Sequence, residues 1–181
     1  MKEKNKTSNF PKLLIISSAR WGKDTFGEIL RDNFDFKFNS SSQAAADIFI
    51  YEALRKKYDY KTSIECFQDR MNHRAEWFNL ICEYNETDKA RLAKDILKNS
   101  DGYVGMRDAD EIEESKRQNL FDLIIWIDAS KRLPAESFDS FNIDISHADI
   151  IVDNNGTLEQ FTNRVIRLGK ILSNYGKNKE I

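Results

Sequence analysis

Short apolar segments alternate with stretches of helical periodicity along most of the chain. Continuous apolar runs at 12–16 and 123–127 predict strands that are buried on both faces, as in a parallel sheet. Three further strands are expected, at 34–38, 102–106 and 149–152. Helices are expected between the strands, at 26–33, 43–57, 62–82, 88–98, 110–119 and 157–172. This alternation predicts an α/β fold with a mainly parallel, doubly wound sheet that binds ligands at the carboxyl ends of its strands.

Polar residues mark where several of these helices begin. Thr62 precedes a glutamate by three residues and Thr157 precedes a glutamine by three, which is the spacing of a capping box. The serines at 40–42 are placed to cap the helix that follows them. These signals support the predicted helix boundaries.

A single domain is predicted over 1–181, because a chain of this length can bury one sizeable core. Residues 1–10 are polar and are expected to form a flexible lead-in. Residues 43–98 are almost wholly helical in pattern. Residues 129–147 form a polar connection that is too long for an ordinary loop, which indicates a mobile lid.

The charge balance gives no reason to expect a polyanionic or membrane partner. The 28 basic residues nearly cancel the 30 acidic ones, although a local cluster could still bind phosphates. The apolar runs are of strand length, and the first ten residues lack the apolar core of a signal peptide, so we expect a soluble, cytoplasmic protein. Cys66 and Cys82 belong to no Cys/His set with zinc spacing, and both are expected to be buried thiols.

The segment 13–25 combines a buried strand, a small-residue turn and the start of a helix. It meets the phosphate-loop formula G-x-x-x-x-G-K-[ST] at Gly22 and Lys23. Ser17, however, replaces the first glycine, and Asp24 stands at the Ser/Thr position. The match is therefore incomplete when the segment is taken alone.

The physical logic of a phosphate loop is nevertheless present. Backbone N–H groups from Arg20 to Asp24 are placed to hold a polyphosphate at a helix N-terminus, and Lys23 adds a positive charge. Thr25, one place after the formula position, would still face the phosphates or a Mg²⁺ ion. The nucleotide-binding residues predicted on this basis are Ser18, Ala19, Arg20, Trp21, Gly22, Lys23, Asp24 and Thr25.

Every predicted strand carries polar residues at its carboxyl end, where a sheet of this kind binds ligands. These polar strand-end residues are 17–25, 40–42, Arg107 with Asp108, Asp128, and Asp153 with Asn154. Among them, we assign Ser41, which follows the second strand, to substrate binding.

Arg70, His73 and Arg74 are spaced so that one face of a predicted helix presents two guanidiniums and an imidazole. Such a triplet suits a phosphate monoester. The alternative is a solvated face that pairs with Asp69 or Glu76.

Arg107 ends an otherwise apolar strand, and Glu111 follows four residues later. A charged arginine at this place is expected to bind substrate or to position Glu111, and a structural ion pair is the alternative. Asp108 could hold Mg²⁺ through water or accept a proton from an attacking hydroxyl, and both roles stay open. Lys131 and Arg132, after the fourth strand, could close on a transferring phosphoryl group or be plain surface charge.

Three separated motifs occur in this order along the chain: 17–25 (SSARWGKDT), Arg107 with Glu111, and 149–159 (DIIVDNNGTLE). Together they resemble the deoxynucleoside monophosphate kinases of large tailed bacteriophages. Kinases of that family pair a GKDT phosphate loop with a strand-end arginine followed by a glutamate. They close with a segment of the form D-[LI]-x-[IV]-x-N-[DN]-G-[ST]-L-E.

The resemblance implies a P-loop kinase-like fold of three layers, with 43–98 as a helical substrate-binding region and a short lid. It implies that Lys23 and Thr25 hold the phosphates of ATP together with Mg²⁺. Arg107 would contact the acceptor nucleotide, and Asn154 would lie near the base of ATP. If the chain is phage-encoded, the expected cytoplasm is that of an infected host cell.

The leading hypothesis is ATP-dependent phosphoryl transfer to a deoxynucleoside monophosphate, giving the diphosphate. Related phage P-loop kinases act on the hydroxymethyl group of a 5-hydroxymethyl-pyrimidine in DNA, and that acceptor stays open, as does a nucleotide-binding module without catalysis. The expected partner is the nucleotide substrate or modified DNA, no membrane partner is expected, and a homodimer stays open. The residues assigned to catalysis are Lys23, Arg107, Asp108 and Arg132. Those assigned to substrate binding are Ser41, Arg70, His73, Arg74, Arg107 and Glu111, and those assigned to metal are Thr25 and Asp108.

Overall fold

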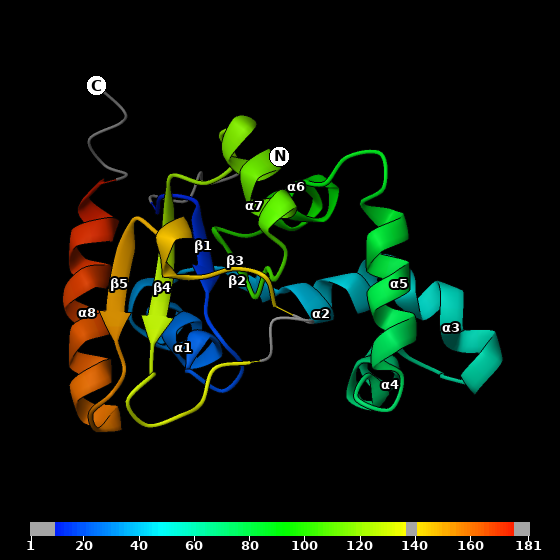
Figure 1. The fold of residues 1–181 in the computed structure, drawn as a ribbon, viewed down its shortest axis with the longest axis horizontal. Helices are drawn as coiled ribbons and strands as arrows, with labels where there is room; N and C mark the ends of the chain where they lie inside the picture. Colours follow the sequence, from blue (N-terminus) through cyan, green and yellow to red (C-terminus); the bar gives the residue numbers. More distant parts are fainter. Residues whose placement is uncertain (1–9, 137–140, 176–181) are drawn as a thin grey trace, which may run out of the picture.

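A five-stranded parallel sheet lies at the centre of the protein (Figure 1). The computed structural model describes residues 10–136 and 141–175. The strands lie side by side in the order β2-β3-β1-β4-β5, with Leu13 of β1 opposite Gly102 of β3 and Leu123 of β4. The predicted three-layer α/β fold with a parallel sheet is confirmed. The strands are β1 (Leu13–Ile16), β2 (Phe38–Ser40), β3 (Gly102–Val104), β4 (Leu123–Asp128) and β5 (Ile150–Asp153).

Helices cover both faces of the sheet, and a group of them extends away from its β2 edge (Figure 1). The extended group comprises α2 (Ser41–Ala45), the π-helical turn η1 (Ala46–Ile50), α3 (Tyr51–Tyr58), α4 (Ser63–Asp69) and α5 (Arg74–Tyr84). We call these elements, residues 41–84, the helical arm. The others are α1 (Lys23–Phe34), α6 (Arg91–Leu97), α7 (Ala109–Arg117), the 3-10 turn η3 (Ile145–His147) and α8 (Leu158–Tyr175).

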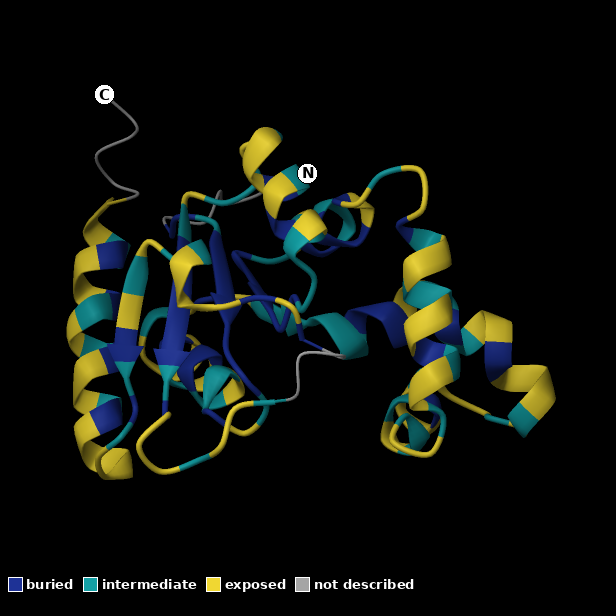
Figure 2. Cartoon of the chain, viewed as in Figure 1, coloured by how far each residue is buried: buried dark blue, intermediate teal, exposed yellow. Residues whose placement is uncertain are grey.

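The alternation of side chains along the strands divides the interior into two cores. Leu13 and Ile15 of β1 pack into the core that contains residues of α1 and α8, whereas Leu14 and Ile16 pack into the core that contains residues of α6 and α7. All four side chains are fully buried, and each such burial stabilises the fold by about 1.5–3 kcal/mol. Figure 2 shows the central strands as the most deeply buried part, with exposed residues on the outer faces of the helices and on the edge strand β5.

Close contact between α1 and α8 depends on Gly169. A Cβ atom at this position would lie 2.3 Å from Cε2 of Phe34 and 2.9 Å from Cδ2 of Leu30. We expect Gly169→Ala to lower the free energy of unfolding by about 1–2 kcal/mol, since the overpacking exceeds the gain in helix propensity. Urea denaturation measures this change. Asn163→Ala, at an exposed site of the same helix, is the control and should not destabilise; an equally stable Gly169→Ala would contradict the packing.

The second strand begins later than the sequence predicted, since only Phe38 of the segment 34–38 belongs to β2. Helix α1 continues to Phe34 and ends where Asp35 adopts a left-handed conformation with φ 56°, and β2 begins only at Phe38. The alternating phenylalanines instead build an aromatic cluster, in which the rings of Phe10 and Phe36 lie 5.2 Å apart. Phe10 is 8% exposed, so the last residue of the expected flexible lead-in belongs to the core.

The single helix expected at 62–82 is also wrong. Helix α4 begins at the predicted Thr62 cap but ends at Asp69, and α5 begins at Arg74 after a turn. The Asp69 carboxylate accepts hydrogen bonds from the hydroxyl of Tyr60 at 2.6 Å and from the side chain of Asn72 at 2.5 Å. Short side chains that bond locally in this way compete with helix continuation. The helix expected at 43–57 is present, with the π-helical turn η1 within it.

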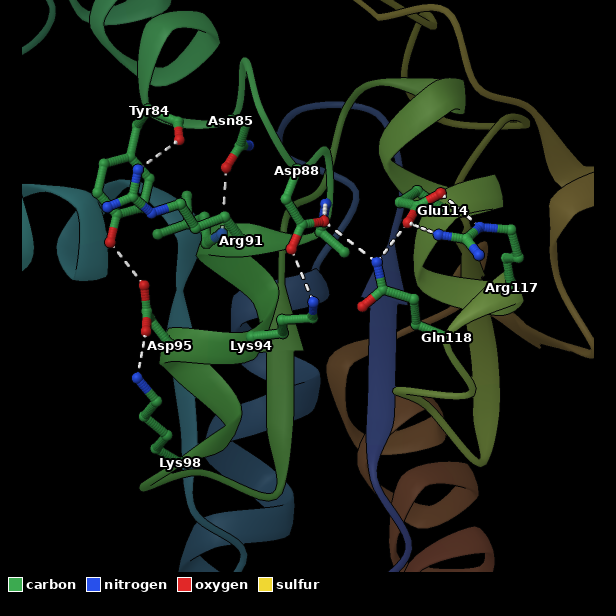
Figure 3. Close-up of polar contacts among 12 residues, drawn as sticks. Tyr84, Asn85, Asp88, Arg91, Lys94, Asp95, Lys98, Glu114, Arg117 and Gln118 are labelled. Atoms are coloured by element: carbon green, nitrogen blue, oxygen red, sulfur yellow. Dashed lines mark hydrogen bonds and ion pairs between the residues drawn. The ribbon is translucent and has the colours of Figure 1, made fainter.

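Polar contacts join α7 to α6 and to the connection that precedes α6, near the end of the helical arm (Figure 3). Asp88 accepts hydrogen bonds from Lys94 at 2.7 Å and from Gln118 at 3.2 Å. These contacts are only partly buried, and ion pairs that stay accessible to solvent contribute little each, about 0–1 kcal/mol. Their role is to fix how α6 lies against α7 rather than to supply much stability.

The two cysteines differ in their surroundings. Cys66 is buried, as predicted, whereas Cys82 is exposed on α5, which corrects the prediction for that residue. Part of the expected lid, residues 137–140, lies outside the described residues, and its remainder includes Phe141 and Ile143 in the core. Among the described helices, none combines the length and the apolar character that a membrane span requires.

Candidate active site

The loop between β1 and α1 has the tight form that a phosphate-binding loop requires. Arg20 and Gly22 have positive φ values of 65° and 101°. A Cβ atom on Gly22 would lie 2.5 Å from Nδ2 of Asn154, so the second glycine of the formula is required by both conformation and space. Ser17, in place of the first glycine, is outside the left-handed region, so its side chain imposes no backbone strain. This residue therefore does not prevent the loop from forming.

The N-terminus of α1 is open to an anion. Its N-cap residue is Gly22, which supplies no side-chain cap, and the first N–H groups of a helix have no intrahelical acceptor. Asp24 is exposed, whereas Thr25 is half-buried in the first turn. Asn154, at the end of β5, donates from its Nδ2 atom to the Trp21 carbonyl at 2.8 Å. The structure thus brings Asn154 and the loop together, as the sequence motifs suggested.

Lys23, the first residue of α1, lies between the loop and the end of β3. Its Cε atom is 3.5 Å from where a Cβ of Gly105 would be, and Ser41 Oγ is 3.4 Å from the same point. Burial lowers the pKa of Lys23; the charge of Asp24 opposes this, and that of Arg107 adds to it. The ammonium group is therefore partly desolvated, which strengthens its interaction with any anion that reaches it.

Arg107 and the loop converge on one carboxylate, that of Glu136. Nη2 of Arg107 donates to Oε1 and Oε2 of Glu136 at 2.8 and 2.9 Å, and Nη1 donates to Oε1 at 3.0 Å. The backbone N–H of Ala19 donates to Oε2 of Glu136 at 2.7 Å. An oxyanion at the carboxyl ends of β1 and β3 is thus bound by an arginine fork and a loop amide. The ordinary alternative for Arg107, an ion pair, is what the structure shows, although its partner is Glu136 rather than Glu111.

Asp108 is the N-cap of α7. Its Oδ1 atom accepts hydrogen bonds from the N–H groups of Asp110 at 2.9 Å and Glu111 at 3.2 Å. Its Oδ2 atom accepts one from the side chain of Asn142 at 3.3 Å. Across 10–136 and 141–175, no group of three or more His, Cys, Asp or Glu side chains could hold a metal ion. A metal role for Asp108 or Thr25 therefore stays a prediction.

Glu111 is bound by Asn85, a residue that the sequence did not single out. The Nδ2 atom of Asn85 donates to Oε1 of Glu111 at 2.7 Å, while its Oδ1 atom accepts from the N–H of Leu92 at 3.1 Å. Asn85 is 1% exposed, and it lies where α5 ends and the chain turns towards α6 (Figure 3). Asn85 thus connects the end of the helical arm to α7 through the partly buried carboxylate of Glu111.

Burial raises the pKa of Glu111 to about 7, and the charge of Asp108 adds to this, whereas the Asn85 hydrogen bond and the charge of Lys89 oppose it. Between pH 4.5 and about 7 the folded protein therefore holds more protons here than the unfolded chain, and stability falls as pH rises. We expect the stability advantage of Glu111→Gln over the wild type to grow by roughly 1–3 kcal/mol from pH 5 to pH 8.

Urea denaturation of both proteins at the two pH values measures this difference. Glu113→Gln removes an exposed carboxylate from the same helix and serves as the control, with no comparable change expected. A pH-independent difference for Glu111→Gln would show that the carboxyl group is not held in a desolvated site.

Arg70, His73 and Arg74 do not share one helix face, contrary to the prediction, because α4 ends at Asp69 and α5 begins only at Arg74. Arg70 stacks its guanidinium 3.8 Å from the centre of the Phe67 ring. His73 lies 3.0 Å from the Asp69 carboxylate, and Arg74 opens α5. These residues lie on the helical arm, away from the sheet (Figure 1), and the structure does not bring them to the loop.

Lys131 and Arg132 are bound to the turn that follows β5. Nε of Arg132 donates to the Asn154 carbonyl at 2.5 Å, and the N–H of Lys131 donates to Oδ1 of Asn155 at 2.8 Å. Arg132 is thus placed beside Asn154 rather than beside Arg107. Its role in closing on a phosphoryl group stays a prediction.

Comparison with solved structures finds kinases of small molecules. The structure is similar to shikimate kinase from Aquifex aeolicus vf5, with TM-score 0.46 and 14% identity, covering 87% of this chain and 95% of that one. A sugar kinase from Janibacter sp. HTCC2649 gives TM-score 0.42 and 14% identity, covering 90% and 96% of the two chains. Shikimate kinase from Bacteroides thetaiotaomicron gives 0.43 and 13%, covering 88% and 96%. No protein-family model and no curated protein matches this chain. These values are too low to assign a family or a substrate.

Proposed function

We propose that this protein transfers the terminal phosphoryl group of ATP to a deoxynucleoside monophosphate. One observation carries the proposal: Arg107 and the loop amide of Ala19 bind a single oxyanion, that of Glu136, and the charges of Arg107 and Glu136 both act on the partly desolvated Lys23. Backbone amides, an arginine fork and a lysine are the groups that proteins use to bind phosphates. All of them lie at the carboxyl ends of central strands, next to the open N-terminus of α1.

The donor half of the site fits a nucleoside triphosphate. The loop is already in the conformation that presents its amides, because Gly22 takes the required positive φ. The Glu136 carboxylate shows that an oxyanion fits against the Ala19 amide. Lys23 and Ala19 would then bind the phosphates, and Asn154, which touches the loop through Trp21, would border the rest of the nucleotide.

The acceptor half is inferred from Arg107 and its neighbours. A guanidinium that already grips two carboxylate oxygens is suited to two oxygens of a phosphate monoester. The motifs shared with phage deoxynucleoside monophosphate kinases support a mononucleotide as the acceptor. Ser41 donates from its Oγ to the Gly105 carbonyl at 3.2 Å and lies on the same side of Gly105 as Lys23, so it is a candidate to contact the acceptor.

The chain's contribution to the reaction is positional and electrostatic. Lys23 and the loop amides orient the donor phosphates, while Arg107 holds the acceptor phosphate so that its oxygen faces the bond to be broken. When bound, ATP would supply the phosphoryl group and Mg²⁺ would neutralise charge on its phosphates. Thr25, in the first turn of α1, and Asp108, at the start of α7, are the candidate residues to hold the ion.

The proposal is tested by incubating the protein with Mg-ATP and each deoxynucleoside monophosphate in turn. We expect ADP formation that depends on one or more of these acceptors and is absent from Lys23→Ala. DNA containing 5-hydroxymethyl-pyrimidine is tested in parallel. Phosphorylation of that DNA alone would show that the acceptor is a base in DNA and not a free mononucleotide. Tight ATP binding with no turnover on any acceptor would show that the protein binds nucleotides without catalysis.

A further inference from the structure

The segment 134–136 lies along the phosphate loop and places Glu136 on it. The indole Nε1 of Trp21 donates to the Pro134 carbonyl at 3.2 Å, and the N–H of Glu136 donates to Oγ of Ser18 at 3.3 Å. The Glu136 side chain is 15% exposed. Contacts through both backbone and side chain thus fix this residue to the loop.

The partners of the Glu136 carboxylate are those that a phosphate group would need. Its oxygens accept hydrogen bonds from the Ala19 amide and from both terminal nitrogens of Arg107, and its charge acts on Lys23. A carboxylate and a phosphate oxygen cannot accept from the same donors at the same time. The two anions must therefore exclude each other.

We propose that Glu136 is an intramolecular ligand of the phosphate site, which an incoming phosphate group must displace. This inference rests on the proposed function, because it concerns the same donors. In the nucleotide-free protein Glu136 keeps the loop amide and Arg107 in the geometry that binds an oxyanion. It also lowers the affinity for short polyphosphates, since only the fraction of molecules with Glu136 released can bind them.

Inorganic pyrophosphate is the appropriate probe, because it carries the phosphates without a base or an acceptor. Its dissociation constant is measured by calorimetry for the wild type, Glu136→Ala and Glu136→Asp. We expect Glu136→Ala to bind at least about 10-fold more tightly, because the competing ligand is gone. Glu136→Asp keeps the charge but is one methylene shorter and cannot reach all the donors, so it should also bind more tightly than the wild type.

Glu28→Gln is the matched control for net charge, because Glu28 is exposed on α1, the helix that follows the loop. It should bind pyrophosphate as the wild type does, and thermal denaturation confirms that each variant is folded. Equal affinities for the wild type and both Glu136 variants would overturn the inference and leave the proposed function standing. Weaker binding by Glu136→Ala would overturn it as well, since Glu136 would then support binding. Failure of every variant to bind pyrophosphate would overturn the inference, while the proposed function is decided separately by phosphoryl transfer from Mg-ATP.

Discussion

Replacing Lys23 by alanine should lower kcat/KM for ATP by about 10²–10³-fold while the protein stays folded. The ammonium group lies beside the loop in a partly desolvated position, and its pKa is lowered chiefly by that burial. A preorganised charge in such a site stabilises developing negative charge far more than it would in water, and removing one donor of this kind typically has this effect. Burial of the charge also costs stability in the free protein, so the variant should be at least as stable as the wild type.

Initial rates at varied ATP and thermal denaturation together check this prediction. Lys170→Ala, which removes an exposed lysine from α8, is the control and should leave both measurements unchanged. Activity of Lys23→Ala within about threefold of the wild type would contradict the assignment of Lys23 to the phosphate site.

Replacing Arg107 by lysine should lower kcat/KM for the acceptor by about 10²-fold, with a smaller effect on the KM for ATP. Lysine keeps the positive charge but loses the fork that grips two oxygens at once, as Arg107 grips Glu136. Arg107→Ala, which loses the charge as well, should lower the same parameter by about 10³-fold. Rates measured with both substrates varied separate the two halves of the site.

Arg117→Lys is a suitable control, because this arginine forms an exposed ion pair with Glu114 on α7. Since Arg107 also binds Glu136, the comparison is repeated in a Glu136→Gln background. If the loss disappears there, it came from release of the Glu136 carboxylate and not from lost acceptor binding. A rise in the KM for ATP alone would contradict this assignment and indicate that Arg107 binds the phosphates of ATP.

The sheet could be predicted from the sequence because its central strands are continuous apolar runs. Leu13–Ile16 and 123–127 are buried on both faces, and their pattern has no competing interpretation at that length. The segment 34–38 was different, because alternating phenylalanines fit a strand and an aromatic cluster equally well. The left-handed Asp35 that ends α1 gave no signal beyond its being an aspartate.

The break between α4 and α5 shows a second limit of pattern reading. Apolar spacing continues across 62–82, but Asp69 is held by the side chains of Tyr60 and Asn72. The Asn72 contact is local, but the Tyr60 contact depends on the folded structure, since Tyr60 precedes α4 and its hydroxyl meets the last residue of that helix. The same break removed the predicted face of Arg70, His73 and Arg74.

Within the candidate site, the sequence could predict the positions of those residues that directly follow a strand. Lys23, Arg107 and Asn154 follow three different strands, and parallel strands bring their carboxyl ends to one edge. Glu136 and Asn85 were missed because each lies in a connection with no periodicity. Nothing in the sequence gave a distance between Glu136 and the loop, and only the folded chain shows that they touch.

The most direct test of the central claim follows the phosphoryl group itself. The protein is incubated with γ-labelled Mg-ATP, a mixture of deoxynucleoside monophosphates and DNA containing 5-hydroxymethyl-pyrimidine, and the products are separated. The account predicts label in a deoxynucleoside diphosphate, and none there with Lys23→Ala. Label found only in the DNA, only in inorganic phosphate, or in the same amount with Lys23→Ala would contradict it.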